Sequence, residues 1–196
     1  NGSLKTSRHF EKGLLNSDGK NPAVVVYGEN HTFQEVQDFQ MGEPIGTHVR
    51  YHTNGKEAYK VNFKNGKKEG KELYFGSDGK VIGEGEFKNG TPIGKHYRNH
   101  ENGKAASLAL FDGQGRLMQP IEEWNNEGQK VREFSIKGEQ IDGSLKEWYD
   151  NGNLKVEASY INGELDGTLK EYYASGKLKT EAHYKNQKRD GSYEER

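Results

Sequence analysis

The chain lacks cysteine and has only four prolines and few large aliphatic residues. Without cysteine it forms neither a disulfide framework nor a thiolate metal site, and the redox compartment is left open. Ile, Leu, Val and Phe together make up about 18% of the chain, just under the level of roughly 20% at which disorder is suspected. A conventional thick core is therefore not expected.

An excess of charge of one sign is also lacking. The 29 Lys and Arg residues nearly balance 30 Asp and Glu, for a net charge of -1, whereas disordered chains usually combine low hydrophobicity with high net charge. This balance also removes the global attraction to nucleic acid or anionic membranes, so neither is implied as a partner. The 26 glycines and 11 tyrosines instead favour a thin, repetitive, aromatic-rich structure.

Long apolar runs are missing as well. The longest is residues 23–27, while a membrane-spanning helix needs roughly 18 apolar residues and a signal peptide an apolar stretch of about 7–15. We therefore expect no transmembrane segment. The sequence opens on Asn1-Gly2 rather than Met, so we interpret it as a processed or trimmed product.

A period of 24 residues organises the chain. Glycines mark the starts of the repeat units, and a gap of 49 residues in the middle corresponds to two units plus one inserted residue: Gly46, Gly70, Gly94, Gly143, Gly167 and Gly191. Periods of this size indicate a repeat architecture. We predict a single array over residues 1–196, with divergent units at 1–45, regular repeats at 46–196 and an irregular unit near 104–142.

Within each unit apolar and polar residues alternate, as expected of half-buried strands. Residues 154–160 show the pattern clearly, and a shorter strand is expected at 145–149. Asn151-Gly152 joins the two with the positive φ that a tight hairpin turn needs, and Asn162-Gly163 marks the next turn. Single hairpins are marginal in water. The sequence thus predicts an all-β fold of tandem β-hairpin repeats that form one elongated, twisted antiparallel sheet.

The units at 143–166 and 167–190 closely resemble the MORN-repeat variant of bacterial proteins, including YwqK-family antitoxins. The shared pattern is E-x-Y/W-Y-x-x-G-x-L-K-x-E-x-x-Y-x-N-G-x-x-x-G. This resemblance implies tandem β-hairpins, no catalysis, no cofactor and a binding role. The compartment is left open between the bacterial cytoplasm and, if an export signal was removed, the periplasm or cell envelope.

Two matching segments, 44–56 and 92–104, carry a histidine and arginine pattern that the C-terminal units do not share. The spacing of His48 and His52 matches two ligands of a helical metal motif, but in a strand they would lie roughly 13 Å apart and could not share an ion. The segments are then either a duplicated two-hairpin unit without chemistry or a polar partner-binding surface. The candidate partner-binding residues, called here the His/Arg strip, are His48, Arg50, His52, His96, Arg98 and His100.

Other chemistry has a structural explanation. Aromatic residues at fixed repeat positions are interpreted as rungs of the sheet rather than a stacking platform: Trp124, Trp148, Tyr149, Tyr172 and Tyr173. Glutamates at a shared phase are interpreted as cross-strand partners of lysines rather than paired acids: Glu84, Glu133, Glu157 and Glu181. No catalytic, cofactor-binding or metal residue is predicted.

Two functions remain open. The first is a noncatalytic module that binds another protein, such as a toxin or effector that it neutralises as an antitoxin or immunity protein. The alternative is a cell-envelope scaffold or lipid-associated repeat protein. The oligomeric state is not implied by either.

The predicted shape can be measured. A compact domain of 196 residues has a radius of gyration of about 16 Å, and an extended array of hairpins should clearly exceed it. Small-angle X-ray scattering at about 16 Å would instead favour a closed barrel or a folded-back sheet.

Overall fold

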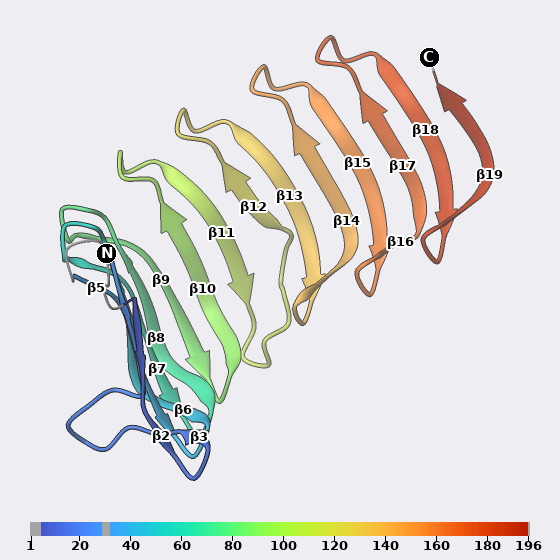
Figure 1. The fold of residues 1–196 in the computed structure, drawn as a ribbon. Coiled ribbons are helices and arrows are strands. Elements are labelled where there is room, and N and C mark those ends of the chain that lie inside the picture. Colours follow the sequence, from blue (N-terminus) through green and yellow to red (C-terminus); the bar gives the residue numbers. More distant parts are fainter. Residues whose placement is uncertain (1–4, 29–31, 196) are drawn as a thin grey trace. The chain divides into compact units, whose positions relative to one another are not determined.

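The computed structural model describes residues 5–28 and 32–195, apart from the side chains of residues 192 and 193. Within these residues all regular structure is strand, and no helix is present that could cross a membrane. Residues 1–4 and 29–31 of the predicted N-terminal units lie outside this description. The chain divides into two units, Asn1–Glu101 and Asn102–Arg196 (Figure 1).

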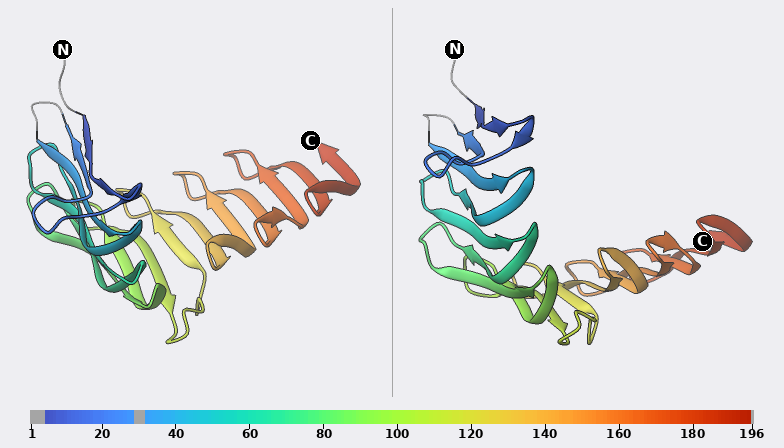
Figure 2. Two further views of the ribbon diagram at one scale, coloured as in Figure 1. Left: turned by 60° about the horizontal axis from the view of Figure 1, so that its bottom comes forward. Right: turned by 90° about the horizontal axis from the view of Figure 1, so that it is seen from below.

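Unit 1 is a series of antiparallel hairpins in which each strand from β4 to β10 pairs with the next. β1 pairs with β4, and β2 and β3 form a separate small hairpin. The strands are curved along their length (Figure 2). Their bounds are β1 Thr6–Arg8, β2 Phe10–Glu11, β3 Leu14–Leu15, β4 Val24–Tyr27, β5 Phe33–Gln40, β6 Glu43–Tyr51, β7 Glu57–Lys64, β8 Lys67–Phe75, β9 Val81–Lys88 and β10 Thr91–Asn99.

Unit 2 repeats this arrangement. The predicted irregular unit begins it: β11 is followed by a long connection in which Met118 is exposed, and β12 is short. The strands are β11 Ala105–Phe111, β12 Ile121–Trp124, β13 Lys130–Lys137, β14 Gln140–Trp148, β15 Leu154–Ile161, β16 Glu164–Leu165, β17 Gly167–Tyr172, β18 Leu178–Lys185 and β19 Lys188–Glu195. The predicted all-β fold of tandem antiparallel hairpins is confirmed.

The two kinds of turn differ from the prediction in one respect. At the first turn of a unit only the glycine has positive φ: Gly55 has a φ of 82° and its N–H donates to the carbonyl of His52 at 2.9 Å. The two-residue tight turn lies at the second connection, where Asn65 and Gly66 have φ values of 50° and 74°. Both residues of that turn need the left-handed region, which asparagine and glycine tolerate best.

The glycines that start the repeat units lie inside strands, except Gly167, which is the first residue of β17. Gly143, with a φ of 99°, belongs to β14, where the pairing shifts between Phe134 and Ile136 of β13. Such a shift is a β-bulge, and glycine supplies its left-handed residue. The bulge interrupts the alternation of apolar and polar residues. For this reason the predicted strand at 145–149 was too short, since β14 begins at Gln140.

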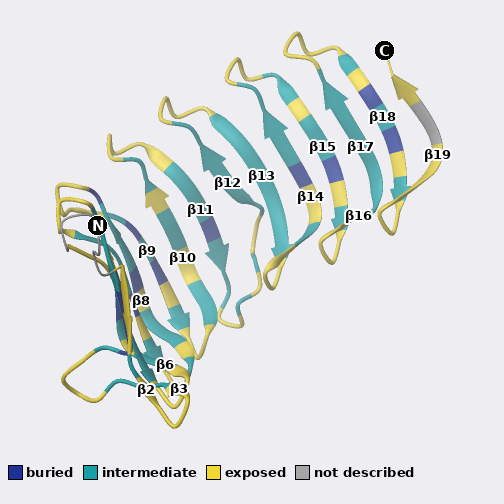
Figure 3. Ribbon diagram, in the orientation of Figure 1, coloured by how far each residue is buried: buried dark blue, intermediate teal, exposed yellow. Residues whose placement is uncertain are grey.

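The core is a thin layer along the middle of the strands (Figure 3). In each buried strand segment only one or two side chains are excluded from water, and turns are exposed on both sides. The buried residues of the regular repeats are mostly small or β-branched: Val49, Val61, Ala109, Leu145, Ala158 and Ala182. Because so little apolar surface is buried, the hairpins depend on correctly registered strand pairing more than on a large apolar core.

Gly167 tests the importance of the bulge. Its φ is 102°, and an added Cβ would lie 3.2 Å from the Cβ of Ser159. A valine side chain is disfavoured there both by the left-handed backbone and by the close contact with Ser159. Gly167→Val should therefore lower the free energy of unfolding by more than about 1 kcal/mol in chemical denaturation. Gly113→Ala is the matched control, because Gly113 is not in the left-handed region and has nothing within 4 Å of an added Cβ. Equal stability of the two variants would contradict a structural role for the bulge.

Candidate functional site

The two arginines of the His/Arg strip belong to one cross-strand row in unit 1. Arg50 of β6 is opposite Tyr59 of β7, and Tyr59 is opposite Tyr74 of β8. Tyr74 is opposite Gly83 of β9, which in turn is opposite Arg98 of β10. We call these five residues the Arg-Tyr row. Directly opposite residues share one face of a sheet, so the arginines point to the same side as the tyrosines.

Aromatic stacking holds both guanidinium groups. The Cζ of Arg50 lies 4.6 Å from the ring centroid of Tyr59, and that of Arg98 lies 4.5 Å from the centroid of Tyr74. The two tyrosine rings are themselves 5.0 Å apart. A guanidinium over an aromatic face is attracted by the ring quadrupole and keeps its N–H edges available. Both arginine residues are exposed.

Gly83 allows Arg98 to reach Tyr74 across a whole strand. A Cβ at Gly83 would lie 2.9 Å from the Cγ of Arg98 and 2.7 Å from the carbonyl oxygen of Tyr97. Any side chain there would displace the arginine. Gly83 was not among the predicted site residues. Its signal was a glycine inside an alternating strand, which indicates close approach of another group.

The row lines a groove of about 870 Å³ in unit 1. Next to the stacked tyrosines, Tyr51 and Phe75 supply apolar wall, while Glu35 and Glu101 supply carboxylates. A smaller neighbouring groove of about 380 Å³ shares several of these residues and extends to Glu72. The groove therefore combines aromatic surface with two arginines and two carboxylates.

A buried carboxylate, that of Glu72, lies beside the tyrosines on the same face and was not among the predicted site residues. Glu72 is 6% exposed, accepts a hydrogen bond from the hydroxyl of Tyr59, and pairs with the Nζ of Lys68 at 2.6 Å. Burial alone would raise the pKa of Glu72, but the bonds from Lys68 and Tyr59 outweigh it and lower the pKa below its ordinary value. Burial and the bond to Glu72 raise the pKa of Tyr59 well above its ordinary range. This network fixes Tyr59 and with it the stack.

The histidines of the strip are less available than the arginines. His48 is only 8% exposed, packs 4.5 Å from the ring of Phe63, and bonds through Nε2 to the carbonyl of Asp38. His52 bonds in the same way to the carbonyl of Phe75 at 2.8 Å. His48 is therefore buried although it lies on the same face of β6 as Arg50, because its ring is used to bind the neighbouring strand.

The third and fourth histidines lie near the second arginine. The ring of His96 packs edge-on against Phe87 at 5.1 Å, and its Nε2 is 2.9 Å from the carbonyl oxygen of Glu86. His96 and His100 are partly exposed. In the described part of the chain no three His, Cys, Asp or Glu side chains converge as metal ligands.

The same row in unit 2 has the opposite charge. There Arg132 is opposite Glu123 and Glu147, with side-chain separations of 4.0 and 3.6 Å. Further along, Val156 is opposite Glu147 and Glu171. The charge of Arg132 is thus neutralised within the row. Because the row contains three glutamates and one arginine, its net charge is negative.

The opposite face of unit 2 carries the expected ion pairs. Lys146 pairs with Glu157 at 3.3 Å, and Lys170 pairs with Glu181 at 3.4 Å. The two other glutamates of this phase, Glu84 and Glu133, also pair with lysines. Exposed pairs of this kind contribute little stability individually. The prediction of cross-strand pairs with lysines holds for Glu84, Glu157 and Glu181, whereas Glu133 pairs with Lys130 of its own strand β13.

The predicted aromatic rungs also have structural contacts. The hydroxyl of Tyr149 donates to the carbonyl of Tyr172 at 2.9 Å, one repeat away. The ring of Trp148 lies 5.9 Å from the ammonium of Lys130. These contacts join neighbouring hairpins and support the interpretation as rungs.

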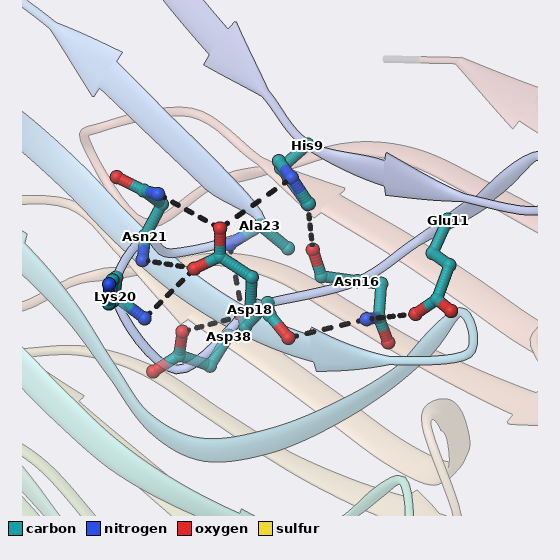
Figure 4. Close-up of polar contacts among 9 residues, drawn as sticks. His9, Glu11, Asn16, Asp18, Lys20, Asn21, Ala23 and Asp38 are labelled. Atoms are coloured by element: carbon teal, nitrogen blue, oxygen red, sulfur yellow. Dashed lines mark hydrogen bonds and ion pairs between the residues drawn. The ribbon is translucent and has the colours of Figure 1, made fainter.

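A separate polar cluster lies near the N-terminus of unit 1 (Figure 4). The hydroxyl of Ser17 donates to Asp38 at 2.7 Å, while His9 lies 3.8 Å from the carboxylate of Asp18. Hydrogen bonds from Asn21 lower the pKa of Asp18 to about 2. The hydroxyl oxygen of Ser17 also accepts hydrogen bonds from the N–H groups of Ala23 and Phe39. Its bonds close the loop that precedes β4.

Tandem antiparallel hairpins with a bulge glycine in each regular 24-residue repeat define the chain as a β-hairpin repeat protein. Four segments match the family model of the MORN repeat variant: residues 44–65, 68–89, 141–162 and 165–186. Two of them lie in each unit, and the first two include Arg50, Tyr59, Tyr74 and Gly83. A search of curated proteins found no match.

The Glu72 network predicts a pH dependence. Its folded pKa is lowered, so its stabilising contribution is present above pH 4.5 and is lost as the pH falls through the folded pKa. The stability difference between the wild type and Glu72→Gln, measured by chemical denaturation, should therefore shrink as the pH falls from about 6 to 3.

Tyr59→Phe provides the control for this cause. It keeps the ring but removes one of the hydrogen bonds that lower the pKa of Glu72. The loss of stability should then begin at a higher pH than in the wild type. An unchanged pH profile would assign the stabilisation to Lys68 alone.

Proposed function

We propose that the chain is a noncatalytic repeat module that binds an acidic protein partner in the groove of unit 1. The observation that carries this proposal is the pair of arginines in the Arg-Tyr row. Both are exposed and stacked on tyrosine, and within the described residues neither forms an ion pair, whereas Arg132 in the corresponding row lies between two glutamates.

Physical chemistry favours a carboxylate-bearing partner. Guanidinium groups pair with carboxylates through two parallel hydrogen bonds. A side chain already held on an aromatic ring also loses less conformational freedom on binding. Arg50 and Arg98 thus present preorganised cations above an aromatic surface, the combination found at interface hot spots.

A membrane surface is the weaker candidate. Recognition of anionic lipid usually requires about four to eight basic residues on one face, and the groove supplies Arg50 and Arg98. The nearby Lys68 is already used by Glu72. For this reason we favour a protein over the lipid-associated scaffold.

The finer role that we propose is neutralisation of a toxin or effector, as in an antitoxin or immunity protein. Support comes from the similarity of four segments to the MORN repeat variant and from the buried carboxylate beside the groove, which is used for structure rather than chemistry. This carboxylate, that of Glu72, is engaged by Tyr59 and Lys68.

Charge reversal of the two arginines tests the function. Arg50→Glu with Arg98→Glu should weaken binding to the protein encoded by the neighbouring reading frame by at least tenfold, because two attractive contacts become repulsive. Isothermal titration calorimetry measures the affinity, and circular dichroism checks that the double variant remains folded.

Lys137→Glu with Lys179→Glu is the matched control, since both lysines are exposed in unit 2 and the net charge changes equally. This control should retain the affinity of the wild type. Full affinity in the arginine double variant would move the site elsewhere. Binding to phosphatidylserine vesicles that depends on Arg50 and Arg98 would favour the scaffold function.

A further inference from the structure

We infer that the groove recognises an extended acidic segment in which two carboxylates are four residues apart, with an apolar or aromatic side chain midway between them. This inference rests on the proposed function and adds the form of the partner. It predicts that a linear motif, rather than a folded acidic surface, occupies the Arg-Tyr row.

The separation of the guanidinium groups sets the spacing. Arg50 and Arg98 are four strands apart, or about 19 Å at normal strand spacing. Arg50 stacks on Tyr59 of the adjacent strand, whereas Arg98 leans inward across Gly83 onto Tyr74, with ring distances of 4.6 and 4.5 Å and 5.0 Å between the rings. Taken end to end, these contacts limit the separation of the two Cζ atoms to about 14 Å.

An extended peptide matches this distance at one spacing. Its rise is about 3.3 Å per residue, so positions i and i+4 are about 13 Å apart and their side chains point to the same side. Position i+3 points to the other side, and i+2 reaches only half the distance. Positions i and i+4 are therefore the spacing on one side of the peptide that comes nearest to this limit, and we take it as the spacing that the groove selects.

The position midway between the carboxylates faces the stacked tyrosines. Residue i+2 points to the same side as the acidic residues and lies over Tyr59 and Tyr74. Their rings are tilted by 53° to each other, and Tyr59 is fixed by its bond to Glu72. A flat or apolar side chain gains contact area there without further ordering of the groove.

The charge around the row limits the motif at one end. Glu35 of β5 is opposite Arg50 on the side away from Tyr59, and it accepts a hydrogen bond from Gln37. An acidic residue at i-2 of the peptide would face this carboxylate. The site therefore selects a short acidic pair and disfavours an acidic tract that extends beyond Arg50.

Labelled peptides and the full chain provide the test. The probe is Gly-Ser-Asp-Gly-Tyr-Gly-Asp-Gly-Ser carrying fluorescein, and fluorescence anisotropy gives its affinity. We expect at least tenfold tighter binding than for a peptide with the acids at i and i+3 or with both Asp replaced by Asn. An additional Asp at i-2 should weaken binding.

Two variants address the geometry directly. Gly83→Ala should displace Arg98 and remove the preference for i+4 over i+3, while Gly113→Ala serves as the matched control. If Gly83→Ala fails to fold, Arg98→Gln tests the same contact without adding a side chain to β9. Either variant should reduce the affinity for the probe peptide by at least fivefold.

The outcomes separate this inference from the proposed function. Equal binding of the i+3 and i+4 peptides, or no peptide binding, overturns the linear motif, while the partner titration still decides the function. Peptide binding that is unchanged in Arg50→Glu with Arg98→Glu overturns both. Salt-sensitive self-association in sedimentation that this double variant abolishes would mean that the acidic face of a second copy occupies the groove.

Discussion

The structure depends on one backbone constraint, a left-handed glycine within the strands of each regular 24-residue repeat. At Gly70 and Gly143, with φ values of 75° and 99°, the strand takes up extra residues and forms a bulge against its neighbour. Because the bulge recurs at the same place, the pairing register is reset identically in every regular hairpin. Residues with the same position in the repeat are thereby brought into rows across the sheet. Different parts of the chain then differ in which side chains occupy the equivalent positions of a row.

The rows explain how a thin sheet can be stable and still carry a polar groove. In unit 2 the row next to the glutamates contains Leu145 and Ala158, which are 5% and 1% exposed. The corresponding row of unit 1 contains His48 and Glu72, each satisfied by bonds to its neighbours. Replacing apolar contacts by a fully bonded polar network is tolerated only where every member has a partner. In unit 1, hydrogen-bonded polar side chains thus replace part of the apolar core and hold the neighbouring aromatic rings in fixed positions.

Much of the fold was predictable because its signals are local. Period and alternation located the hairpins, and the glycine series located the repeat units. The extent of β14 was missed because the bulge breaks the alternation from which strands are recognised. For the candidate site, Arg50 and Arg98 stood out as departures from the C-terminal units. The burial of His48 depends on a carbonyl in another strand, and the role of Gly83 depends on a side chain that crosses over it. Neither relation is visible in a single sequence without knowledge of the register.

The turns at one end of the hairpins are linked by side chains that reach into the next repeat. Asn54 donates to the carbonyl of Ser77, and Asn151 donates to that of Ala174, in both cases at 2.8 Å. These hydrogen bonds reach backbone carbonyls, so they do not depend on the sequence of the next repeat. Insertion or removal of a whole 24-residue repeat therefore leaves every regular turn with an equivalent neighbour. The separation of Arg50 and Arg98 would then change in steps of one hairpin. The number of repeats between the arginines sets their separation. Gain or loss of a single repeat there would change the length of ligand that the groove accepts, while the architecture stays the same.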